Sequence, residues 1–195
     1  MPNWSLTDAV PLLSETRSVK TEFDFQNLKL VNEMNAYGLA AAAEAVRDEK
    51  TEMEIATLCE KAIMDKIVDY TGRVDFVRAL AFVMAGPENG ARACWPYNIS
   101  SAYKMKKGEL CMIELNTQVN GYWSDITRTW VVGRNPTSDQ KDMMNTINNG
   151  IAEAFKVCKP GTPTTDVDRA SRDSIMKTKW GKYHTPFLGH GIGVK

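Results

Sequence analysis

The dipeptide Asn120-Gly121 constrains the fold of this chain more than any other feature. It separates residues 110–115 from residues 122–132, two runs rich in apolar, aromatic and β-branched side chains, and such runs are typical of β-strands. Asn-Gly is the commonest two-residue hairpin turn, because both of its positions take a positive φ. The sequence therefore predicts a β-hairpin whose register is set by this turn.

The predicted register brings two acidic residues to the same face of the hairpin. It pairs Asn116 with Asp125 and Glu114 with Thr127. Since side chains alternate along a strand, Glu114, Asn116 and Asp125 share one face. Glu114 and Asp125 are then diagonal neighbours, with Cβ atoms roughly 7 Å apart. The hairpin thus predicts that two carboxylates converge on one point.

Two carboxylates this close do not ionise together without a compensating charge. Either one is protonated or cations lie between them, and two oxygen-ligated metal ions roughly 3.5–4 Å apart fit such a gap. The alternative is a solvated pair in which Asp125 bonds Arg128 or a turn amide. Hairpin geometry alone leaves both interpretations open.

The chain has 195 residues, with 24 basic and 24 acidic side chains. This length suits one domain with a sizeable core, and the balanced charge gives no electrostatic footprint for a nucleic acid. Four scattered cysteines among apolar neighbours indicate buried thiols in a reducing compartment. The first 15 residues do not resemble a secretory signal, and no apolar run approaches a membrane span. We therefore expect a cytoplasmic protein without membrane contact.

Helical and strand patterns alternate in blocks along the chain. Residues 1–20 form a lead-in without sustained periodicity, and strands are predicted at 76–84, in the hairpin, and in a terminal segment at 183–195. Residues 91–99 are a candidate strand that lies at an edge or breaks at Pro96. Helices are predicted over 21–47, 51–70, 138–158 and from 164 or 165 to Gly181. This order predicts an α+β domain, one curved antiparallel sheet covered by helices.

The third predicted helix shows a pronounced apolar stripe. Ser138 is its expected N-cap. The residues expected to face inward are Met143, Ile147, Ile151, Ala154 and Phe155, which recur at helical spacing.

His190 lies in the segment Gly189-His-Gly-Ile-Gly193. Flanking glycines let the backbone approach a ligand closely and leave the imidazole uncrowded. A histidine in a glycine-rich segment can also be an ordinary turn residue. Neutral imidazole is, however, the commonest metal ligand in proteins, and together with the two carboxylates His190 favours a metal site.

These features together resemble a known family. Glu114 and Asp125 with ten residues between them, the Gly-Tyr-Trp-Ser-Asp-Ile-Thr-Arg-Thr segment at 121–129, and Gly-His-Gly-Ile-Gly resemble the "pita-bread" metallopeptidases. This family includes methionine aminopeptidase, Xaa-Pro aminopeptidase and prolidase, with creatinase as a non-metal relative. The resemblance covers about residues 15–195 and is strongest toward the Xaa-Pro peptidase branch. It implies a pita-bread catalytic domain over 21–195, built from two pseudo-twofold helix–helix–hairpin units.

The resemblance also implies a metal site. Asp125 matches the carboxylate that bridges two metals, and His190 matches the single histidine ligand. Glu114 lies where the family has an aspartate, so its longer side chain reaches a metal with altered geometry. In the complete protein the implied cofactors are two divalent ions (manganese, iron, cobalt or zinc) that activate a water for peptide hydrolysis near an N-terminus. No catalytic acid or base is assigned.

The sequence departs from the family near residue 97. The family's hydrolases carry a substrate-facing histidine 17 or 18 residues before the first carboxylate, and those places hold Tyr97 and Pro96. Tyr97 is a substrate-binding candidate through its hydroxyl, or an edge-strand aromatic. A tyrosine is a poor general base near neutral pH.

A second departure lies at the end of the sequence. The family continues with a His-Glu-x-Pro segment and two glutamates that complete the dinuclear site, whereas this sequence stops at Val194-Lys195. We therefore expect an incomplete second half, without the last metal ligands, and a chain that is inactive or nearly so by itself.

The main functional prediction is a metal-dependent peptidase of the Xaa-Pro aminopeptidase or dipeptidase type. One alternative is a non-peptidase enzyme on the same fold, such as a creatinase-like amidinohydrolase or a sulfonium lyase acting on a small molecule. Another is a pseudo-enzyme that binds a ligand. The expected partners are a peptide or small-molecule substrate and no nucleic acid, and a homodimer is compatible with the resemblance.

Overall fold

A computed structural model describes residues 5–46, 50–86, 99–185 and 188–194. The helices are α1 (Val10–Ser18), α2 (Glu22–Ala45), α3 (Glu52–Lys66), α5 (Ser138–Val157) and α6 (Thr164–Met176), with short 3-10 helices η2 (Ile67–Tyr70) and η3 (Gly181–Tyr183). The strands are β1 (Val77–Ala85), β2 (Leu110–Val119), β3 (Tyr122–Val131) and β4 (Gly193–Val194). Residues 91–99, the candidate strand, lie outside the described ranges except for Ile99.

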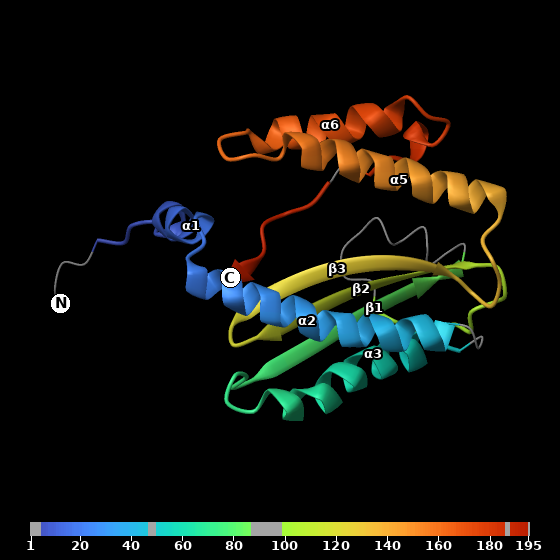
Figure 1. Ribbon diagram of the computed structural model, residues 1–195, viewed down its shortest axis with the longest axis horizontal. Helices are drawn as coiled ribbons and strands as arrows, with labels where there is room; N and C mark the ends of the chain where they lie inside the picture. The colour runs from blue at the N-terminus through green and yellow to red at the C-terminus, as the bar shows by residue number, and fades with distance from the viewer. Residues whose placement is uncertain (1–4, 47–49, 87–98, 186–187, 195) are drawn as a thin grey trace.

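The four strands form one antiparallel sheet in the order β1-β2-β3-β4. In Figure 1, α2 and α3 lie across the sheet, while α5 and α6 form a separate pair near the top of the view. The terminal segment descends from this second pair to β4, which pairs with the first residues of β3. The prediction of an α+β domain with an antiparallel sheet and helices is confirmed.

The hairpin turn has the predicted geometry. Asn120 has φ 51° and Gly121 has φ 89°, and the strands pair in the predicted register. The Asn120 amide also binds the segment before β1: its Nδ2 donates to the Arg73 carbonyl at 2.8 Å, and its Oδ1 accepts from the Asp75 amide at 2.9 Å. These contacts fix the turn against the rest of the sheet.

The first helix pair, α2 and α3, covers one face of the sheet. Each helix begins with a capping box, Thr21 with Asp24 and Thr51 with Glu54, which satisfies amide groups that a helix start leaves open. Gly38 lets the helices and the sheet meet: a Cβ there would lie 2.7 Å from Leu115 Cδ2 and 3.2 Å from the Cys59 carbonyl oxygen. The main core lies here and includes Val31, Met34, Ile55, Ile63, Val83, Ile113, Leu115 and Val119.

The second pair, α5 and α6, repeats the geometry of the first pair. A Cβ on Gly150 would lie 2.8 Å from Ile175 Cγ1 and 3.1 Å from Ser171 Oγ. The spacing of these three residues in the sequence equals that of Gly38, Cys59 and Ile63 in the first pair. This repeat agrees with the expected pseudo-twofold arrangement of helix pairs.

The face of the second pair that corresponds to the sheet-covered face of the first is open. An apolar groove of about 260 Å³ lies there, lined by residues that include Met143, Ile147, Ile151, Ile175 and Leu188. The prediction that Ile147, Ile151 and Phe155 face inward is wrong for this structure, since all three are exposed, and only Ala154 of the predicted stripe is buried. Within the described ranges, no strand packs on this face to bury it.

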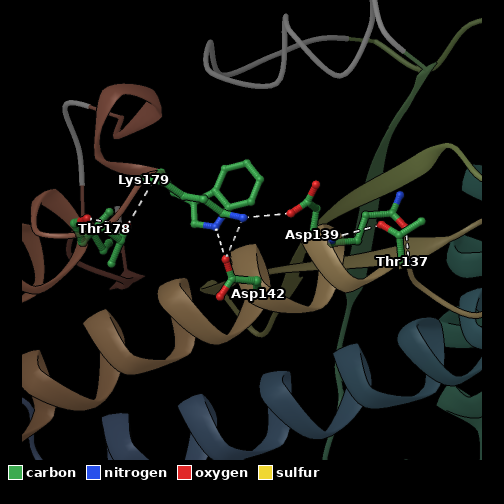
Figure 2. Close-up of polar contacts among 8 residues, drawn as sticks. Thr137, Asp139, Asp142, Thr178 and Lys179 are labelled. Carbon is green, nitrogen blue, oxygen red and sulfur yellow. Dashed lines mark hydrogen bonds and ion pairs between the residues drawn. The ribbon is translucent and has the colours of Figure 1, made fainter.

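A polar cluster fastens the segment after α6 to the start of α5. Figure 2 shows Lys179 between Asp139 and Asp142, with Nζ–oxygen distances of 2.8 and 3.2 Å. The Trp180 indole donates to Asp142 at 2.9 Å. These two donors, Trp180 first and then Lys179, hold the pKa of Asp142 below its usual range.

Two further predictions need correction. The lead-in contains the helix α1, although none of its residues is buried, so sequence periodicity gave no sign of it. The N-cap of α5 is Thr137 rather than Ser138, because the Thr137 hydroxyl accepts from Gln140 in a capping box. Among the helices of the described ranges, none has the length and apolar character needed to cross a bilayer.

Candidate metal centre

Asp125 is positioned by the residues that precede it on β3. The Tyr122 hydroxyl donates to Asp24 of α2 at 2.6 Å, and the Ser124 hydroxyl donates to Asn32 of α2 at 2.8 Å. Tyr122 and Ser124 are buried against the helices, so alternation places Asp125 on the opposite, open face. There its side chain retains 22% exposure.

The same face carries Glu114 and Asn116. Asn116 is the direct partner of Asp125 across the β2–β3 ladder, and Glu114 is the partner of Thr127. The predicted shared face for Glu114, Asn116 and Asp125 is therefore confirmed. Phe82 of β1 pairs with Glu114, so an apolar side chain borders the acidic pair.

His190 reaches Asp125 although 65 residues separate them in the sequence. The pairing of Gly193 with Trp123 brings the terminal segment alongside β3. The His190 Nε2 then lies 3.0 Å from Asp125 Oδ2, and its Nδ1 lies 2.9 Å from the Gly191 carbonyl oxygen. The imidazole side chain is 58% exposed, so it is accessible from solvent.

The hydrogen bonds of His190 suit a metal ligand. The Gly191 carbonyl only accepts, so Nδ1 carries a proton and Nε2 is left to face Asp125. A backbone carbonyl that holds the other ring nitrogen is the usual way to orient a ligating histidine. At 3.0 Å, Nε2 and Asp125 Oδ2 are close enough for one divalent ion to bind both atoms. An octahedral ion with bonds of about 2.1 Å separates neighbouring ligand atoms by about 3.0 Å.

Glu114 is held by Asn116 and stands apart from the histidine. The Asn116 Nδ2 donates to Glu114 Oε1 at 2.9 Å. Among the residues that the structure describes, no three His, Cys, Asp or Glu side chains are close enough together to enclose an ion. The structure therefore brings Asp125 and His190 into contact and places Glu114 on their face, while metal ligation by the three remains a prediction. Tyr97, the predicted substrate-binding residue, lies outside the described residues.

Three other candidate metal ligands in the described residues, His184, Cys59 and Cys111, are engaged or inaccessible. The His184 Nδ1 lies 3.2 Å from Arg172, which also forms an ion pair with Asp168. Burial raises the pKa of the Cys59 and Cys111 thiols to about 12, so both remain protonated near neutral pH and neither suits a metal or a nucleophilic role.

Sequence reasoning missed the contact between Asn116 and Glu114. It placed both on one face, but it assigned no role to the amide. The signal was the spacing of two residues along a strand, which puts neighbouring side chains on the same side of the sheet. Whether they bond depends on rotamers, which spacing does not give.

Comparison with known proteins shows which family and fold the whole chain is similar to. The Xaa-Pro dipeptidase of Pyrococcus furiosus is 27% identical over 186 residues, which is 94% of this chain and 50% of that protein. A prolidase structure from Thermococcus sibiricus matches with a TM-score of 0.83 and 28% identity, covering 97% of this chain and 49% of that one. An X-Pro aminopeptidase structure from Thermotoga maritima shares the fold at a TM-score of 0.80 and 24% identity, over 94% and 49% of the two chains.

The chain thus spans about half the length of the relatives it matches, and its fold is the pita-bread fold of those structures, as predicted. The model of metallopeptidase family M24 matches residues 26–195, which include Glu114, Asp125 and His190. This chain is a member of metallopeptidase family M24.

Proposed function

We propose that this chain carries the metal-binding face of a peptidase of the Xaa-Pro type. The observation that carries the proposal is the contact between His190 and Asp125 on an open sheet face, at 3.0 Å. A carboxylate and an imidazole with a fixed outer nitrogen are suitable ligands for a divalent ion. The names of the relatives, Xaa-Pro dipeptidase and prolidase, suggest peptides with proline in the second position as substrates.

Each residue would have a separate part in this site. Asp125 and His190 would hold the ion at the start of β3, and Glu114 would bind from the diagonal position on β2. Two divalent cations, when bound, supply an activated water and a polarised carbonyl. The open face admits the peptide, and Phe82 borders it with an apolar surface. Manganese, iron, cobalt and zinc all accept this mixture of oxygen and nitrogen ligands.

We further propose that the 195-residue chain is inactive or nearly so by itself. Two carboxylates and one imidazole supply fewer ligands than two cations require. We also propose a cytoplasmic location, which the free, buried thiols of Cys59 and Cys111 support, because reduced cysteines are typical of that compartment. A homodimer remains a prediction.

The first test is metal binding. Titration calorimetry with MnCl₂ should show binding to the wild-type chain and a large loss of affinity in Asp125→Ala and His190→Ala. His184→Ala is the matched control, because this second histidine contacts Arg172 rather than the sheet face. Equal affinity in all four proteins would refute the proposed site.

The second test is catalysis. With Mn²⁺ and an Xaa-Pro dipeptide, the chain should show little or no cleavage. Cleavage that disappears in Asp125→Ala would contradict the proposed inactivity while supporting the site. A panel of small non-peptide substrates tests the alternative enzymes, and metal-independent turnover of such a compound would favour a non-peptidase.

A further inference from the structure

The amide of Asn116 occupies a particular position between the two carboxylates. Across the ladder it is the direct partner of Asp125, and along its own strand it bonds Glu114 at 2.9 Å. A carboxylate only accepts hydrogen bonds, so the NH₂ group of Asn116 must face Glu114. One oxygen of Glu114 is thereby engaged, and in the described residues its Oε2 has no hydrogen-bond partner.

Glu114 has a particular need for such a partner. Its side chain has three rotatable torsions, so an unrestrained carboxylate loses much rotamer freedom on binding an ion. Glu114 is partly exposed, and its neighbours across the ladder, Phe82 and Thr127, offer no cation to hold it. A hydrogen bond from a residue on a rigid central strand restricts this freedom before an ion arrives.

We propose that Asn116 is a positioning residue, which holds Oε1 of Glu114 so that Oε2 is presented to a divalent cation. The inference rests on the proposed function for the identity of the ligand. Partners that hold a ligating carboxylate contribute 10- to 100-fold to metal affinity in typical sites. Asn116 itself need not touch the ion.

The test variants are substitutions at two residues of β2, Asn116 and Gln118. Asn116→Val removes the donor and keeps a residue that favours β-structure. Asn116→Gln keeps a donor amide and is the rescue variant. Gln118→Val is the matched control, because Gln118 is an amide on the same face of the same strand, two residues further on. Circular dichroism and urea unfolding establish that each variant is folded.

Two measurements on the 195-residue chain test the inference. Calorimetric titration with MnCl₂ should show affinity reduced by about 10- to 100-fold in Asn116→Val, largely restored in Asn116→Gln and unchanged in Gln118→Val. Without metal, NMR three-bond couplings should show a fixed Glu114 rotamer in the wild type and averaged rotamers in Asn116→Val. A merely structural role would not produce this pairing of results.

The outcomes separate the inference from the proposed function. If the wild type binds Mn²⁺ and Asn116→Val binds equally well, the positioning role is wrong and the metal site stands. If the wild type binds no Mn²⁺, the proposed site fails, and the couplings alone decide whether Asn116 holds Glu114. Unchanged couplings in Asn116→Val would overturn the inference in either case.

Discussion

The two helix pairs share one internal design and differ in what covers them. Gly38 in the first pair and Gly150 in the second sit at equivalent crossing points. In the first pair the crossing also meets Leu115 of the sheet, whereas in the second it faces an apolar groove. The contrast shows that sequence spacing determines how two helices meet, while burial depends on a third element.

The largest difference is expected at the equivalent isoleucines. Ile63 is fully buried, so Ile63→Ala should cost about 2–5 kcal/mol. Ile175 is partly exposed at the groove, so Ile175→Ala should cost less than about 2 kcal/mol. Urea unfolding of both variants measures the two values. Equal losses would show that the second pair is as well covered in solution as the first.

A smaller difference is expected at the two glycines. In Gly38→Ala the new methyl would meet Leu115 and a backbone oxygen, so overpacking should cost about 1–3 kcal/mol. In Gly150→Ala it would meet only side-chain atoms of Ile175 and Ser171, and Ile175 can shift into the groove. The substitution also gains up to about 1 kcal/mol in helix propensity. This gain should offset the cost of moving Ile175 and leave the free energy of unfolding nearly unchanged. Destabilisation of Gly150→Ala by as much as Gly38→Ala would contradict this.

The acidic groups that anchor the two pairs should differ in their response to pH. The hydroxyls of Thr21 and then Tyr122 lower the pKa of Asp24 to about 2. A lowered pKa adds stability that is complete above the unfolded value near 3.8 and is lost as the pH falls through about 2. Tyr122→Phe should therefore reduce the urea midpoint of unfolding above pH 4. The difference in midpoint between this variant and wild type should become smaller toward pH 2.

The corresponding change in the second pair is Trp180→Phe. It removes the first of the donors that lower the pKa of Asp142, so the effect should have the same sign. We expect a smaller difference in urea midpoint between this variant and wild type, since Lys179 still binds Asp142. A pH-independent gap in either variant would mean that the lost contact stabilises the fold by packing rather than through the carboxylate.

The smallest effect is expected at Phe155. This side chain is 75% exposed on α5, so Phe155→Lys should change stability by no more than about 0.5 kcal/mol. Thermal unfolding of the variant beside wild type measures the change. A loss above about 2 kcal/mol would show that Phe155 is buried in solution, as its periodicity predicted.

The parts that sequence predicted well depend on local chemistry. The hairpin register follows from Asn120-Gly121, since both positions adopt the required positive φ. The predicted helix start at residue 51 agrees with α3, whose N-cap is Thr51. At the start of α5 two adjacent residues, Thr137 and Ser138, both carry a hydroxyl that can cap a helix. The hydrogen bond with Gln140 identifies Thr137 as the N-cap.

The parts that sequence could not supply depend on distant partners. The apolar stripe of α5 had a helical period, but periodicity does not reveal whether a sheet lies against it. His190 was linked to Asp125 through family resemblance, because no local rule joins residues so far apart. The bond between Asn116 and Glu114 required side-chain rotamers in addition to register.

The anchored turn at Asn120 has a consequence for how this protein can vary. Its amide joins the backbone at Arg73 and Asp75, so the loop cannot lengthen without losing both attachments. One inserted residue before Gly121 that slips β3 by a single step along β2 would turn Asp125 toward the helices, while Glu114 keeps its facing through the pairing of β2 with β1. In related sequences the residues of the candidate metal site should therefore vary more readily than the length of the turn that sets their position.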